Sequence, residues 1–116
     1  MMNENVWIYR ETLSRDVADS QKLVGYSVEA TDGDIGKIDE ASTETSRSYL
    51  VVDTGFWIFG KKRMLPAGVV DRIDVDDRRI FVNRTKDQIK DAPDWDDARA
   101  ADVDYRVSHS DYYGRF

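Results

Sequence analysis

The chain has 116 residues and a mass of 13.4 kDa, which suits one domain, because about 50 to 200 residues sustain a single hydrophobic core. Hydrophobic residues make up 41% and charged residues 34%, so the chain can bury a modest core, but it contains no run near the roughly 18 apolar residues of a membrane span. The net charge of −6 opposes broad attraction to nucleic acid or to an anionic membrane, and the lack of cysteine excludes disulfides and thiolate zinc sites.

Composition divides the chain into an N-terminal extension (1–21), a compact β domain (22–93) and an acidic tail that contains aromatic residues (94–116). Seven acidic and three basic residues follow Lys90, so four of the six net negative charges lie there. Because the tail has few aliphatic residues, we expect much of it to be mobile or to pack only through its aromatic side chains. The first residues show no secretory signal, so we expect a cytoplasmic protein without membrane insertion.

A β-hairpin is predicted at the start of the compact domain. Apolar residues alternate over residues 23–30, which is typical of a half-buried strand, and they place Val24, Tyr26, Val28 and Ala30 on one face. Residues 31–34 contain Gly33 and predict a turn, after which residues 35–38 return as a second strand.

Further short strands follow in chain order. Residues 49–53 are almost continuously apolar, which predicts a strand covered on both faces. Strands are also predicted over 56–59, over 64–65 before Pro66, over 69–75 and over 80–82, with a turn at 60–63. Thr85 and Gln88 form a capping-box pattern, which predicts a helix of one or two turns that Pro93 ends.

About six short strands joined by glycine and aspartate turns predict a small antiparallel barrel or a strongly bent sheet. We favour the barrel, because closing a sheet removes its exposed edges.

The order of several motifs carries a resemblance. These motifs are the glycine-containing turn at 32–38, the strand at 49–53, the aromatic segment at 55–61 and the Leu65-Pro66 pair. In this order the chain resembles the PRC-barrel family, and in particular small stand-alone bacterial members of the actinobacterial type. The resemblance implies an all-β, antiparallel PRC-type barrel of about six strands with a short C-terminal helix and extended tails. It also implies an interaction or assembly module, and the family has no shared catalytic residues.

Candidate catalytic and metal sites are weak. His109 is the only histidine and falls in the polar tail, where we expect a solvated side chain. Two aspartate groups, at 74–77 and 94–97, lack the spacing of a calcium loop, and the glycines are too far apart for a phosphate loop. We therefore expect no catalytic residues, no cofactor, no bound metal and no enzymatic activity.

The aromatic segment at 56–59 is the strongest candidate for binding. In a strand, two of its four side chains point to each face, so one pair lies outside a barrel unless something covers it. One candidate cover for this outward pair is an aromatic side chain from the terminal segments: Trp7, Tyr9, Trp95 or Tyr112. A partner protein or a second copy is the other, and we expect a homodimer and a protein partner anchored by Trp57 and Phe59.

Two alternatives stay open. The basic run Lys61, Lys62 and Arg63 lies beside aromatic residues, which is the pattern of an RNA- or ribosome-binding surface, although the net charge makes nucleic acid a weaker choice. The third alternative is a small-molecule binder or an enzyme that uses the barrel mouth.

Overall fold

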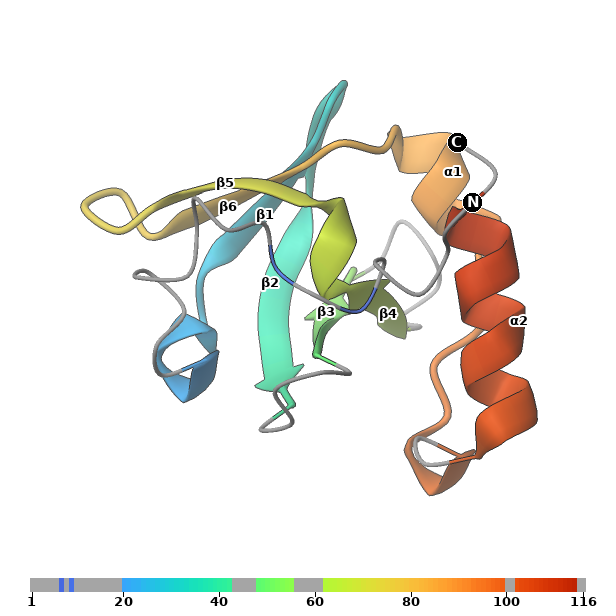
Figure 1. Ribbon diagram of the computed structural model, residues 1–116. Coiled ribbons are helices and arrows are strands. Elements are labelled where there is room, and N and C mark those ends of the chain that lie inside the picture. Colours follow the sequence, from blue (N-terminus) through green and yellow to red (C-terminus); the bar gives the residue numbers. More distant parts are fainter. Residues whose placement is uncertain are drawn as a thin grey trace.

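The computed structural model describes residues 7, 9, 20–42, 48–55, 62–99 and 102–114 (Figure 1). Its centre is one six-stranded sheet with the strand order β4-β3-β2-β1-β6-β5. In chain order the elements are η3 (Ser20–Leu23), β1 (Ser27–Ala30), β2 (Gly33–Ala41), β3 (Tyr49–Asp53), β4 (Lys62–Pro66), η4 (Ala67–Val69), β5 (Val70–Asp74), β6 (Arg79–Val82), α1 (Lys86–Lys90), η5 (Asp97–Arg99) and α2 (Val103–Tyr113).

The predicted first hairpin is confirmed, since β1 pairs antiparallel with β2. Its start differs from the prediction at Val24, which lies before β1 and is 39% exposed instead of buried. The cause is Gly25, whose φ of 92° turns the backbone and interrupts the alternation that the sequence indicates.

Strands β3 and β4 consist mostly of buried residues, although β4 lies at one edge of the sheet. Leu50, Val51 and Val52 are each 0% exposed, so the predicted strand with two covered faces is confirmed. Strand β4 already begins at Lys62, so Lys62 and Arg63 belong to a strand and not to the predicted turn. The predicted strand at 56–59 lies outside the described residues.

The predicted helix after the last strand is also confirmed. The hydroxyl of Thr85 accepts a hydrogen bond from the backbone N–H of Gln88 (3.1 Å), and the side-chain oxygen of Gln88 accepts one from the N–H of Thr85 (2.8 Å). This reciprocal capping box begins α1.

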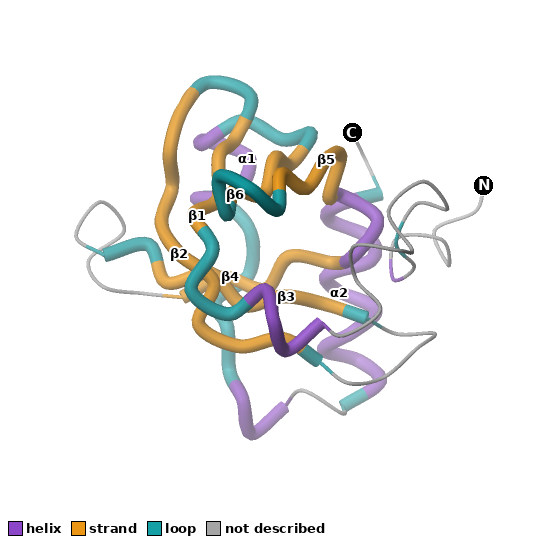
Figure 2. The backbone as a smooth tube through the Cα atoms, turned by 90° about the vertical axis from the view of Figure 1, so that its left-hand side faces the viewer, coloured by secondary structure: helices purple, strands orange, loops and turns teal. Residues whose placement is uncertain are grey.

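The sheet is mixed and open, which corrects the prediction of an antiparallel barrel. Strand β1 pairs parallel with β6, and the outer strands β4 and β5 form no ladder with each other in the part of the chain that the structure describes. The strands nevertheless curve around one interior (Figure 2), and buried apolar side chains from all six of them form the core. A six-stranded, mainly β architecture is thus present without a closed barrel.

The acidic tail contains a helix, which corrects the expectation of an extended or mobile tail, although its packing is mainly through aromatic side chains, as expected. Residues Val103–Tyr113 form α2, and the side chain of Asp102 caps its start by accepting hydrogen bonds from the N–H groups of Asp104 and Tyr105. The stripe Tyr105, His109 and Tyr113 is buried and follows the i, i+4 spacing of a helix face. The prediction of a solvated His109 is therefore wrong, because this side chain is 0% exposed.

The segment before α2 covers the outer edge of β4. The backbone of Asp94 forms an isolated antiparallel bridge with Arg63, and the N–H of Trp95 donates a hydrogen bond to the carbonyl of Lys62 (3.2 Å). An unpaired strand edge is a template for unwanted association, so this contact protects β4.

Gly36 marks the closest approach between two strands. A Cβ atom at this position would lie 2.0 Å from the backbone oxygen of Asp53 on β3, and the φ of Gly36 is 145°. Both the space and the backbone conformation therefore require glycine.

We predict that Gly36→Ala lowers the free energy of unfolding by about 3 kcal/mol or more, because β2 and β3 have to separate to admit the methyl group. Gly55→Ala is the matched control, since Gly55 also has a positive φ (63°) but no atom within 4 Å of the added Cβ. Its cost should be about 1 kcal/mol. Chemical denaturation of both variants measures the difference, and equal costs would refute the close-approach explanation.

Candidate functional site

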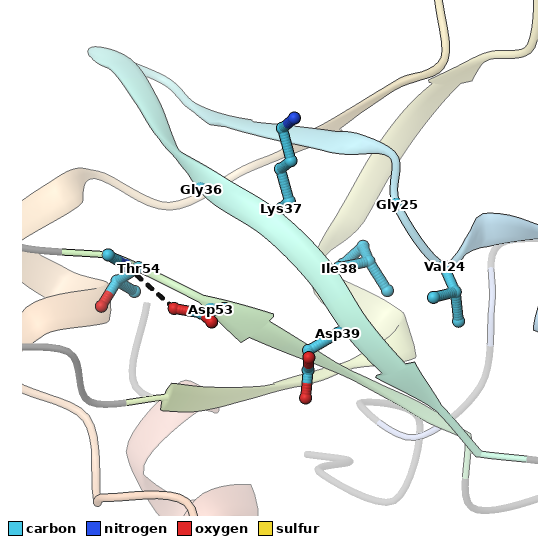
Figure 3. A pocket seen from close by; sticks show the side chains of 9 residues that line it. Val24, Gly25, Gly36, Lys37, Ile38, Asp39, Asp53 and Thr54 are labelled. Carbon is cyan, nitrogen blue, oxygen red and sulfur yellow. Dashed lines mark hydrogen bonds between the residues drawn. The ribbon is translucent and has the colours of Figure 1, made fainter.

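An open groove of about 490 Å³ lies where the ends of three segments meet (Figure 3). The turn before β1, the middle of β2 and the end of β3 form its walls. The lining residues are Val24, Gly25, Gly36, Lys37, Ile38, Asp39, Asp53, Thr54 and Gly55.

One end of the groove is apolar. In Figure 3 the side chains of Val24 and Ile38 lie toward one end, and that of Asp53 lies toward the other. Ile38 is buried, whereas Val24 is one of the few large aliphatic side chains that stay exposed in the described part of the chain. Gly25 presents bare backbone directly after Val24, and Gly55 also lines the groove, next in sequence to Thr54. Such a surface can accept an apolar side chain and approach another backbone closely.

At the rim of the groove, the carboxylate of Asp39 is neutralised by an ion pair with Lys62. The ammonium group of Lys62 lies 2.7 Å from a carboxylate oxygen of Asp39. This hydrogen bond, with the nearby charges of Glu40 and Asp53, raises the pKa of Lys62. Asp53 itself is exposed and accepts a hydrogen bond from the N–H of Gly55 (3.0 Å), which fixes the chain as it leaves β3.

Arg63 has a different environment from its neighbour Lys62. It is 4% exposed, and its guanidinium donates to the carbonyls of Ile89 (3.2 Å) and Lys90 (2.9 Å) at the end of α1. It also forms an ion pair with Asp94 at 2.8 Å. Because adjacent residues of a strand point to opposite faces, the structure does not bring Lys62 and Arg63 together into one cationic surface.

The other candidate binding residues, Trp57, Phe59 and Lys61, lie outside the described residues. Sequence reasoning missed Val24 as a groove residue, because it assigned this side chain to the buried face of a strand. The signal that could have found it is Gly25, which interrupts the alternation directly after Val24.

A second group of residues that sequence reasoning missed lies under α2. Tyr105, Trp7 and Met64 form a buried cluster, and Tyr49 and Trp95 pack against it. The i, i+4 spacing of Tyr105, His109 and Tyr113 was the available signal.

Metal clusters and membrane-spanning helices are both absent from the described residues. Within these ranges no group of three or more histidine or acidic side chains is placed to hold a metal ion. Likewise, none of the helices found there is both long enough and apolar enough to cross a membrane.

The family model of the PRC-barrel domain matches residues 16–89, which is more than half of the chain. The chain belongs to the PRC-barrel family. This finding confirms the resemblance that the motifs indicate, and the matched range contains every strand of the sheet and the groove described above.

Other comparisons add little about this PRC-barrel chain. A solved structure described as a 16S ribosomal RNA processing protein, RimM, from Pseudomonas aeruginosa is 23% identical, with a TM-score of 0.48. The alignment covers 57% of this chain and 43% of that chain, so the present chain spans less than half of the other protein. A comparison with the curated proteins gave no match.

We predict that Arg63→Met lowers the free energy of unfolding by about 3 kcal/mol, because buried carbonyl acceptors lose their charged donor. Lys62→Met removes an exposed ion pair and should change the free energy by less than about 1 kcal/mol. Urea denaturation of the two variants provides the comparison. Similar small losses in both would contradict a structural role for Arg63.

Proposed function

We propose that this PRC-barrel domain is a non-catalytic interaction module that binds a protein partner at the groove beside Val24. The observation that carries this proposal is an exposed aliphatic side chain in an open groove, with bare backbone at Gly25 beside it and at Gly55 elsewhere in the lining. Isolated apolar side chains are common on surfaces, but one placed in a groove with accessible backbone has the features of a docking site.

The position of the groove along the chain supports the aromatic anchors expected from the sequence. Asp53 pairs with Lys62 in the antiparallel register of β3 and β4, so residues 54–61 connect the two strands. Gly55 lines the groove, and Trp57 follows two residues later. Two residues span at most about 7 Å, so the proposed anchor is only a short stretch of chain away from a residue of the groove wall. We therefore propose Trp57 and Phe59 as anchors that act together with Val24.

We also propose that the protein forms a homodimer, in which a second copy covers part of the aromatic segment. Four consecutive large apolar residues, Phe56 to Phe59, supply the kind of side chains that are enriched at the buried centre of protein interfaces.

RNA or ribosome binding has less support. Of the three cations in the basic run, Arg63 is buried in contacts with α1 and Asp94, and Lys62 is paired with Asp39. Neither side chain is available to phosphate without giving up a contact that it already makes.

We predict that Val24→Asp and Trp57→Ala each abolish capture of the partner from a native cell lysate, because a charge or a lost indole removes the apolar contact. Val75→Asp is the matched control, since Val75 is 50% exposed but lies beyond the end of β5, outside the groove. Quantitative mass spectrometry of the captured proteins reads the outcome. If the unaltered protein and all three variants retain the same proteins, the groove is not the docking site.

We predict that light scattering of the purified chain gives twice the mass of 13.4 kDa at high concentration, and that Trp57→Ala shifts the mass toward a single copy. A mass of one copy at all concentrations for the unaltered chain would remove the dimer proposal and leave the partner proposal standing.

A further inference from the structure

The environment of His109 is unusual for an ionisable side chain. It lies on the inner face of α2 and is 0% exposed. Its ring meets Tyr105 edge-on at 4.6 Å between centroids and lies nearly parallel to Tyr113 at 6.4 Å. The imidazole is therefore enclosed by aromatic rings of its own helix on the side that packs against the sheet.

The hydrogen bonds of His109 define one neutral form. Nδ1 lies 3.0 Å from the backbone oxygen of Tyr105, and since a carbonyl only accepts, Nδ1 carries the hydrogen and donates. Nε2 then holds a lone pair, and this buried atom has no partner in the part of the chain that the structure describes. Adding a proton to Nε2 would create a buried donor without an acceptor.

The described charged groups that face His109 are both cations. Arg106 comes from α2 and is 6% exposed, and Arg63 comes from β4 and is 4% exposed. Burial lowers the pKa of His109 most, the hydrogen bond to Tyr105 opposes this effect, and the two arginines lower the pKa further. An imidazolium at this position would be a third buried positive charge.

Side-chain contacts hold α2 to the rest of the molecule. The hydroxyl of Tyr113 donates to the carbonyl of Met64 on β4 (3.0 Å), and Arg84 donates to the carbonyl of Tyr113 (2.7 Å). Trp7 donates to Ser110 (2.6 Å) near the same end of the helix. The aliphatic residues Val103 and Val107 face solvent, so they do not stabilise this packing. In Figure 1, α2 lies to one side of the sheet, outside its strand ladder.

We propose that His109 is a proton-sensitive latch: the neutral imidazole keeps α2 packed on β4, and uptake of one proton at Nε2 releases the helix and uncovers the aromatic cluster around Met64. The released helix exposes the imidazole to water, where it takes up a proton with an ordinary pKa near 6.5. Above that pH the packed state is favoured in full. As the pH falls below 6.5, the opening constant of α2 rises by up to about tenfold per pH unit, until the pH reaches the lowered pKa of the packed state.

Hydrogen exchange of the α2 amides between pH 7.5 and 5.0, corrected for intrinsic exchange rates, tests the latch. We expect the opening constant of residues 103–113 to rise by up to about tenfold from pH 7.5 to 5.5, while the amides of β2 and β3 stay protected. His109→Gln and His109→Phe cannot take up the proton, so their α2 amides should show no such rise. A rise of the same size in both variants, or opening of α2 and the sheet together, would overturn the proposal.

A second measurement keeps the test decisive if neither variant folds. His109 is the only histidine, so its ring signals in an NMR titration of the unaltered protein are unambiguous. We expect the ring to stay neutral below pH 6.5 as long as α2 is protected. An imidazole that titrates at or above pH 6.5 while α2 stays packed would show that no latch exists.

Discussion

A buried positive charge, the guanidinium of Arg63, holds much of this molecule together. An arginine side chain stays protonated at physiological pH, so a residue that is 4% exposed requires acceptors around it. These acceptors are the carbonyls of Ile89 and Lys90 and the carboxylate of Asp94. Strand β4 therefore fixes the end of α1 and the segment that follows it. Further along the chain, a second buried guanidinium, that of Arg84, donates to the carbonyl of Tyr113 at the end of α2.

Strand alternation gives two adjacent residues of β4 separate roles. Lys62 faces β2 and pairs with Asp39 at the rim of the groove, whereas Arg63 faces α1 and the C-terminal segment. The walls of the groove come from the turn before β1, from β2 and from β3, so Lys62 of β4 reaches the groove only through its ion pair with Asp39.

Local sequence patterns predicted the local structure of this chain. The first hairpin, the apolar strand β3 and the capping box at Thr85 each depend on residues close in sequence, and each is confirmed. The parallel pairing of β1 with β6 was not predictable, because it joins distant residues and leaves no local pattern. Helix α2 was not predicted, because its buried face is made of tyrosine and histidine instead of aliphatic residues. For the candidate site, the separation of Lys62 from Arg63 follows from their being adjacent residues of a strand. The sequence analysis placed both residues in a turn and therefore could not predict it.

The parallel pair of β1 and β6 also has a consequence for how the chain reaches its native state. Val28 aligns with Ile80, about fifty residues later, whereas the other pairs among β1 to β4 join strands that are neighbours in sequence. During synthesis, the edge of β1 that pairs with β6 stays unpaired until Val82, the last residue of β6, has been made. The slow step of folding should then be the docking of the β5–β6 hairpin onto a preformed four-stranded meander, since closing a long loop costs entropy before the new contacts repay it.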